Sequence, residues 1–254
     1  MQDEQAAGAT PAAPLPGEAG TGDPRPAGQV RREVSAVLDR LAEGGVGIVP
    51  LDVAYAIIAM RESGIRRIFQ AKNRSYEKPS GMFGDWQLSR EVHILPDRVH
   101  DVVRAMIEEV GLPFSVVAPF RADHPIFERV DPFVLANSSK GDTLDMLLNA
   151  GQVHDEIARQ VRERGTPVFG SSANTSLAGS KYRYGDIEDQ VRAAADIHLD
   201  HGLSKHANPH GRSSTIIDFS DFSVIRVGVR FDDLRQAFAE RHGIELTINE
   251  RTAQ

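Results

Sequence analysis

Helical and strand-like segments alternate along most of this 254-residue chain, and this alternation limits the fold more than any other feature. Apolar residues recur at helical spacing in segments that we expect to be helices: 31–45, around 65–69, 97–110, around 157–161, 186–195 and 231–243. Between them lie β-branched runs that we expect to be strands: 46–51, 114–120, 166–170, 214–219 and 222–227. A tight Ser-Asp turn joins the last two into an antiparallel hairpin. The sequence therefore predicts an α/β fold with a mixed β-sheet flanked by helices.

The ordered part of the chain contains no internal repeat and no linker that would divide it. We therefore expect one domain over residues 29–254, with a core at about 31–230 and a helix in the C-terminal extension. Residues 1–28 are mainly Ala, Gly and Pro with few large apolar groups. Such a segment cannot bury enough surface to offset the entropy lost on ordering, which predicts a disordered tail.

Composition excludes several functional classes. A net charge of -7 argues against a protein whose whole surface binds nucleic acid, although it allows a local basic cleft. The chain has no cysteine, which excludes disulfides, thiol catalysis and zinc–thiolate sites. No apolar run approaches the ~20 residues of a membrane helix, and the N-terminus lacks the pattern of a secretory signal. We expect a cytoplasmic protein with no membrane partner.

A cationic cluster follows the helix expected around 65–69. Lys72 and Arg74 alternate along the chain, with Lys78 just beyond them. Alternate residues of an extended segment share a face, so Lys72 and Arg74 are expected to reach the same anion. Arginine offers a fork to two phosphate oxygens and lysine a point charge, which suits a phosphate under attack. The alternative is a helix end whose charges are simply solvated.

A second polar segment, Gly170 to Asn174, follows the strand expected at 166–170. Open α/β sheets commonly bind ligands beyond the ends of their strands. The Ser172 hydroxyl and the Asn174 amide are short neutral donors that could contact the same anion as the cationic cluster. The alternative is a plain β-turn, because Ser, Asn and Gly favour turns.

Asp52 and Tyr55 follow the strand expected at 46–51. Asp52 either orients an ammonium group of a substrate or caps a turn. Tyr55 either closes over a substrate or packs as a half-buried side chain. Both are candidates for substrate binding.

Four histidines between 198 and 210 raise the question of a metal site. Asn208-Pro209 prevents a helical pair of ligands between the last two, so a polar loop is expected and no metal-binding side chains are predicted. The chain also contains no Walker A loop, G-x-G-x-x-G, H-E-x-x-H or G-x-S-x-G motif. Any nucleotide must therefore be bound in a different way.

Taken together, the motifs resemble those of the YrdC-like family, whose best-known members are threonylcarbamoyl-AMP synthases. The matching segments are P-L-D-V-A-Y-A at 50–56, K-N-R at 72–74, K-P at 78–79, S-A-N-T-S-L at 172–177, S-T-I-I-D at 214–218 and R-V-G at 226–228. Each motif is weak alone, and their order and spacing carry the resemblance. It covers about residues 31–230.

The resemblance implies a twisted mixed sheet with a positively charged concave surface. It also implies that threonine, bicarbonate and ATP are converted to threonylcarbamoyl-AMP and pyrophosphate for tRNA modification, with tRNA or structured RNA as a partner. Mg²⁺ would arrive with the nucleotide and have no dedicated protein ligands. The implied catalytic residues are Lys72 and Arg74. The implied nucleotide-binding residues are Lys78, Ser172, Asn174, Ser214 and Arg226.

Several positions depart from the family's pattern. Leu51 and Val53 stand where the family has threonines, and Ala56 replaces a glycine. The stretch 143–151 lacks the arginine that the family carries before its Ser-Ala-Asn turn, and Leu177 replaces another glycine. Loss of two hydroxyls should weaken recognition of a polar amino acid. The chain is therefore expected to be a threonylcarbamoyl-AMP synthase, a relative that uses another amine, or a non-catalytic paralogue that binds a nucleotide or RNA.

Overall fold

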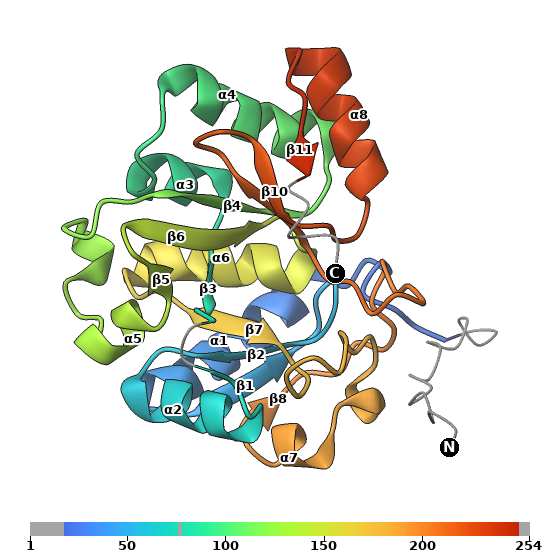
Figure 1. Ribbon diagram of the computed structural model, residues 1–254. Helices are drawn as coiled ribbons and strands as arrows, with labels where there is room; N and C mark the ends of the chain where they lie inside the picture. The colour runs from blue at the N-terminus through green and yellow to red at the C-terminus, as the bar shows by residue number, and fades with distance from the viewer. Residues whose placement is uncertain (1–17, 76–77, 249–254) are drawn as a thin grey trace, which may run out of the picture.

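The computed structural model describes residues 18–75 and 78–248 and shows one continuous sheet flanked by helices (Figure 1). Its strands are β1 Val46–Val49, β2 Ala56–Ala59, β3 Gly81–Phe83, β4 Phe114–Pro119, β5 Ser139–Lys140, β6 Thr143–Leu148, β7 Phe169–Ser172, β8 Ile197–His198, β9 Thr215–Asp218, β10 Ser223–Arg226 and β11 Thr247–Ile248. The helices are α1 Ala27–Ala42, α2 Glu62–Ala71, α3 Trp86–Val92, α4 Asp97–Ala105, α5 Pro132–Ala136, α6 Gln152–Arg164, α7 Asp189–Arg192 and α8 Phe231–His242. A π-helical turn at Met106–Val110 continues α4.

The sheet is mixed, as the sequence predicts. The strands follow the order β11-β10-β9-β4-β6-β3-β7-β2-β1-β8, and β5 pairs with β6. The central strand β4 pairs antiparallel with β6 and parallel with β9. The β9–β10 hairpin is antiparallel, which confirms the predicted closing hairpin.

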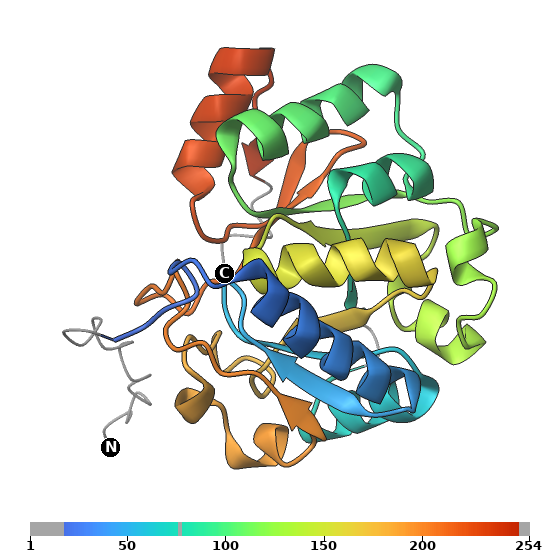
Figure 2. The same cartoon turned by 180° about the vertical axis from the view of Figure 1, so that it is seen from behind.

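The apolar periodicity of the first helix has the predicted role. Val34, Val37, Leu38 and Leu41 are fully buried on one face of α1. Figure 2 shows α1 and α6 side by side across one face of the sheet. Burial of this apolar stripe against the strands contributes to folding in the usual way, by removing apolar surface from water.

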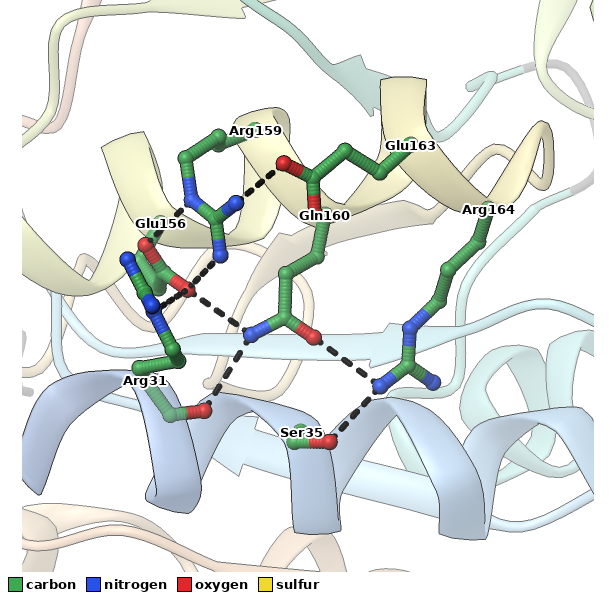
Figure 3. Close-up of polar contacts among 7 residues, drawn as sticks. All are labelled: Arg31, Ser35, Glu156, Arg159, Gln160, Glu163 and Arg164. Carbon is green, nitrogen blue, oxygen red and sulfur yellow. Dashed lines mark hydrogen bonds and ion pairs between the residues drawn. The ribbon is translucent and has the colours of Figure 1, made fainter. Parts of the chain in front are cut away.

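A polar network joins α1 to α6 (Figure 3). The buried Gln160 amide donates to the Arg31 carbonyl at 3.1 Å and to Glu156 Oε1 at 2.8 Å. Arg164 donates to Ser35 Oγ at 2.8 Å and to Gln160 Oε1 at 2.9 Å. Gln160 therefore uses both ends of its amide and links the two helices.

Strand β6 carries one acidic side chain, Asp145, on its less buried face. Leu144, Met146 and Leu148 are fully buried, whereas Asp145 and Leu147 are partly exposed. Because successive side chains of a strand point to opposite faces, Asp145 and Leu147 share the face away from this buried set.

Some predicted boundaries were wrong. The expected strand at 166–170 is displaced to β7, the expected helix at 186–195 shortens to α7, and the short strands β2 and β3 were missed. Residues 18–28 do not form part of a disordered tail: Thr21 N donates to the Leu203 carbonyl at 2.9 Å, and α1 begins at Ala27. These long-range contacts leave no trace in composition, and residues 1–17 lie outside the described residues.

Within the described residues, none of the helices has both the length and the apolarity needed to cross a membrane.

Candidate functional site

A hollow of about 140 Å³ lies over the central strands. Its polar lining comes from five strands or strand ends and from the loop after α2: Arg74, Ser115, Asp145, Ser172, Ser214 and Arg226. Its apolar lining includes Leu51, Val53, Phe83, Leu147 and Ile216. Five of the residues selected from sequence therefore line one hollow although they are far apart in the chain: Tyr55, Arg74, Ser172, Ser214 and Arg226.

Arg74 organises the loop that follows α2. Asn73 adopts a left-handed conformation, with φ of 48°, and the Arg74 amide donates to the Phe69 carbonyl at 2.9 Å. The guanidinium then donates from Nε to the Lys78 carbonyl at 2.9 Å and from Nη2 to the Pro79 carbonyl at 2.7 Å. These bonds hold the cation at the edge of the hollow, where it can meet an anion.

Lys72 points elsewhere. It caps the C-terminus of α2 with helical φ and ψ, so the segment is not extended and the expected shared face with Arg74 is wrong. The Lys72 ammonium is buried and donates to the carbonyls of Ser172 and Asn174. Burial and, to a lesser extent, the charge of Arg74 together lower the pKa of Lys72 to about 7, with Glu188 acting in the opposite direction. In this geometry Lys72 holds the Ser-Ala-Asn turn in place and is not part of the lining of the hollow.

The Ser-Ala-Asn turn keeps unused polar atoms. Ser172 lines the hollow at the end of β7. Asn174 is buried beside it, and its amide nitrogen donates to the Thr175 carbonyl at 2.5 Å. Across 18–75 and 78–248, the Asn174 Oδ1 atom and the hydroxyls of Ser171 and Ser176 have no hydrogen-bond partner. The turn can therefore accept new partners without giving up existing bonds.

The closing hairpin supplies a second cation. A register shift between Val224 and Arg226 breaks the regular β9–β10 pairing. The Arg226 guanidinium reaches the residue before β9 and donates to the Ser214 carbonyl at 2.8 and 3.1 Å and to Ser214 Oγ at 3.0 Å. Ser214 Oγ lies 3.5 Å from Ser115 Oγ. This arrangement places a fixed guanidinium and two hydroxyls on one side of the hollow.

Asp145 is a site residue that the sequence analysis missed. Its side chain lines the hollow, and its Oδ1 atom is shielded from solvent with no hydrogen-bond partner in the described part of the chain. Burial raises the pKa of Asp145, while Arg226, the Ser115 hydroxyl and Arg74 act in the opposite direction. An acidic residue within an otherwise apolar strand, 143–148, was the available signal.

Asp52 and Tyr55, the two predicted substrate-binding residues, line different hollows. Asp52 lines a different hollow, of about 290 Å³, with Gln152 and Lys205. The fully buried Tyr55 has its hydroxyl 2.7 Å from Asp200 Oδ1 and 2.8 Å from the Gly202 carbonyl. Although Tyr55 contributes to the lining of the first hollow, its hydroxyl is already bonded on the far side.

The side chain of Lys78 is exposed and is not among the residues that line the first hollow, although its carbonyl accepts a bond from Arg74. The histidines at 198 and 201 have partners of their own: His198 stacks on Tyr184, and His201 Nε2 lies 3.0 Å from Glu33 Oε2. In the ranges that the structure covers, no three acidic or histidine side chains cluster as metal ligands would.

Comparison with known proteins identifies the family. Residues 39–228 match the model of the Sua5/YciO/YrdC family, which carries the description "telomere recombination". No curated protein sequence matches the chain significantly. Because the family model covers most of the chain, this protein belongs to the Sua5/YciO/YrdC family, and the predicted YrdC-like relationship is confirmed.

Solved structures agree on the fold. A hypothetical protein from Streptococcus mutans UA159 superposes with a TM-score of 0.71 at 17% identity, covering 87% of this chain and 94% of that one. Sua5 from P. abyssi, complexed with L-threonine, superposes with a TM-score of 0.66 at 17% identity, covering 89% of this chain and 61% of Sua5. E. coli YciO gives a TM-score of 0.54 at 16% identity, covering 77% and 86%. At such identities the likeness establishes the twisted α/β fold, and this chain spans less than two thirds of Sua5.

Proposed function

We propose that this protein is an ATP-dependent synthase of a carbamoyl adenylate, with threonine as the first amino acid to test. The observation that carries the proposal is the convergence of Arg74, Arg226, Ser172 and Ser214 on one hollow. Two guanidiniums and two hydroxyls suit the oxygens of a phosphoryl group. Family membership and a neighbour solved with L-threonine support the same reaction class.

In the proposed reaction the amine captures carbon dioxide to give an N-carboxy amino acid. The new carboxylate attacks the α-phosphorus of ATP in line, and pyrophosphate leaves. Arg74 and Arg226 stabilise the charge that develops on the phosphoryl oxygens, and the Ser172 and Ser214 hydroxyls orient the group. Lys72 acts as a positioning residue, because its ammonium fixes the turn that carries Ser172.

The hollow fits a phosphoryl group and a small amino acid better than a whole nucleotide. Its volume of about 140 Å³ is below the ~300 Å³ at which drug-sized pockets begin, so the nucleoside must extend over the open rim. Mg²⁺ bound to the triphosphate would neutralise phosphate charge and would remain with the nucleotide. The cytoplasm and tRNA modification remain the predicted setting of the reaction.

The test uses purified full-length protein with ATP, Mg²⁺, bicarbonate and L-threonine. Pyrophosphate release should require both bicarbonate and threonine, and chromatography should show a new adenylate. Omission of each substrate in turn is the control. Release that is independent of both, or no release with any amine in a panel of amino acids, contradicts the proposal. Release with another amine but not threonine identifies a relative with a different substrate.

One observation favours a second candidate, a paralogue that binds a nucleotide or structured RNA without turnover. Both arginines of the hollow already donate to backbone carbonyls, as they would in a site that only binds. ATP would then bind without pyrophosphate release, and binding of structured RNA would fall steeply with salt.

A further inference from the structure

The Asp145 carboxylate in the lining of the hollow does not help to bind an anion. A carboxylate repels the phosphate oxygens that Arg74 and Arg226 attract. The stretch 143–151 contributes Asp145 and Leu147 to the lining and contains no arginine or lysine. Phosphate binding therefore does not explain the carboxylate in the lining.

The surroundings of Asp145 compensate its charge only in part: Arg226, the Ser115 hydroxyl and Arg74 lower its pKa, but burial raises it by more. Among residues 18–75 and 78–248, nothing hydrogen-bonds to its shielded Oδ1 atom. The two nearest cations have donated elsewhere, Arg74 to the carbonyls of Lys78 and Pro79 and Arg226 to Ser214. Burying a carboxylate without a partner is unfavourable, so the arrangement makes physical sense if a ligand supplies the partner.

The remaining lining defines the ligand. The guanidiniums and hydroxyls of the lining call for an anionic group, and the carboxylate beside them calls for a cation that donates hydrogen bonds. Leu51, Val53 and Phe83 provide an apolar surface between the polar groups. The hollow has a volume of about 140 Å³, so the part of a ligand that it encloses is compact. A small zwitterion, with an ammonium and a carboxylate close together, satisfies all these conditions.

We propose that Asp145 binds the ammonium group of a small α-amino acid whose carboxylate faces Arg74 and Arg226. The inference rests on the proposed function, because this amino acid is the amine substrate of that reaction. It makes Asp145, rather than Asp52 or Tyr55, the residue that recognises the amine. A divalent cation bound by Asp145 is the competing occupant, and the experiment separates the two.

The experiment is calorimetric titration of full-length protein with L-threonine and L-valine in the presence of a chelator and without nucleotide. Wild-type protein should bind at least one of them, and N-acetyl-L-threonine, which lacks the ammonium, should not bind. Asp145→Asn should weaken amino-acid binding about 10- to 100-fold, as expected when a hydrogen bond between charged groups is lost. Titration with Mg²⁺ alone should give no signal that depends on Asp145.

The matched control is Asp142→Asn, three residues away at an exposed position outside the hollow. It should bind amino acids like wild type. Asp145→Asn should also melt at the same or a higher temperature than wild type, because it removes a carboxylate whose burial the nearby cations offset only in part. A lower melting temperature with unchanged binding would assign Asp145 a structural role and overturn the proposal.

Other results would also overturn it: equal binding by Asp145→Asn, binding of the N-acetylated compound, or no amino-acid binding by wild type. A second variant, Asp145→Ser, provides the same comparison if Asp145→Asn fails to fold. The titrations need no turnover. Amine binding through Asp145 without pyrophosphate release would therefore contradict the proposed function alone, and pyrophosphate release that Asp145→Asn leaves unchanged would contradict this inference alone.

Discussion

Buried polar groups pair with one another between α1 and α6, whereas around the hollow several have no protein partner. Gln160 is bonded at both ends of its amide, to Arg31, Glu156 and Arg164. Around the hollow, by contrast, Asp145 Oδ1 and Asn174 Oδ1 are shielded yet lack a hydrogen bond to any described residue. Both regions contain charged side chains on regular elements. The difference indicates that the helix contact is built for stability and the hollow for exchange of partners.

The sharpest test of this contrast is Arg74→Gln. Loss of a charge that stabilises the transition state should lower kcat/KM about 10²- to 10³-fold. Stability should change little, since the described hydrogen bonds of the Arg74 guanidinium go to the carbonyls of Lys78 and Pro79 in its own loop. Pyrophosphate release and thermal melting measure the two quantities. Arg98→Gln, at an exposed position on α4, is the matched control, and an equal loss in that variant would remove the special role of Arg74.

Lys72→Met should affect both stability and activity. The sequence predicts Lys72 as a catalytic residue, whereas its contacts in the structure hold the Ser-Ala-Asn turn. The Ser172 and Asn174 carbonyls would lose their donor, at a cost of about 1–3 kcal/mol in the free energy of unfolding. Activity should fall because the turn shifts. Urea denaturation measures the first effect, and Lys140→Met, on the exposed strand β5, is the control.

The pH dependence of the same variant gives an independent check. The pKa of Lys72 is about 7 in the folded chain and about 10.4 in the unfolded chain. Between these values the unfolded chain holds a proton that the folded chain has released. The free energy of unfolding should therefore rise with pH above 7, by up to about 1.4 kcal/mol per unit, and this contribution should be flat below 7. Lys72→Met should lack the slope, and an identical slope in both proteins would contradict it.

Gln160→Leu tests the helix contact alone. The substitution keeps the size of the side chain and leaves the Arg31 carbonyl and the Arg164 guanidinium short of a partner, so stability should fall by about 1–2 kcal/mol. Activity should not change. Gln236→Leu is a close control, because Gln236 is exposed on α8 and bonds only to Glu240. A loss of activity without a loss of stability would show that the two regions are coupled.

The sequence predicted one part of the site because its motifs carry local information. Arg74, Ser172, Ser214 and Arg226 stand in recognisable segments, and the loop after α2 and three strands or strand ends bring them to one hollow. The direction of Lys72 could not be predicted by alternation, since Asn73 takes a left-handed conformation and turns the chain. The helices with strong apolar periodicity, such as α1, were predicted well, and short buried strands such as β3 were not.

Asp145 illustrates what a single sequence leaves out. The position of Asp145 in the hollow depends on the register of the strands. β6 pairs with β4 so that Asp145 lies opposite Val117 and Leu147 lies opposite Ser115. Parallel pairing of β6 with β3 brings Gly81 close as well, and a Cβ there would lie 3.3 Å from Asp145 Oδ2. These pairings join segments more than 25 residues apart, and neither composition nor local periodicity specifies them.

Substitution in the apolar lining of the hollow should have the smallest effect, a change in selectivity between threonine and valine. Val53 lines the hollow where the family's pattern carries a threonine, so the site should prefer L-threonine over its isostere L-valine only weakly. Val53→Thr should raise the ratio of kcat/KM for threonine over valine about three- to tenfold, because a hydroxyl in the wall can bond the substrate hydroxyl. Val110→Thr, outside the hollow, is the control. A ratio that Val53→Thr leaves unchanged would mean that the substrate side chain faces another wall, and that Asp145 and the arginines alone orient the amine.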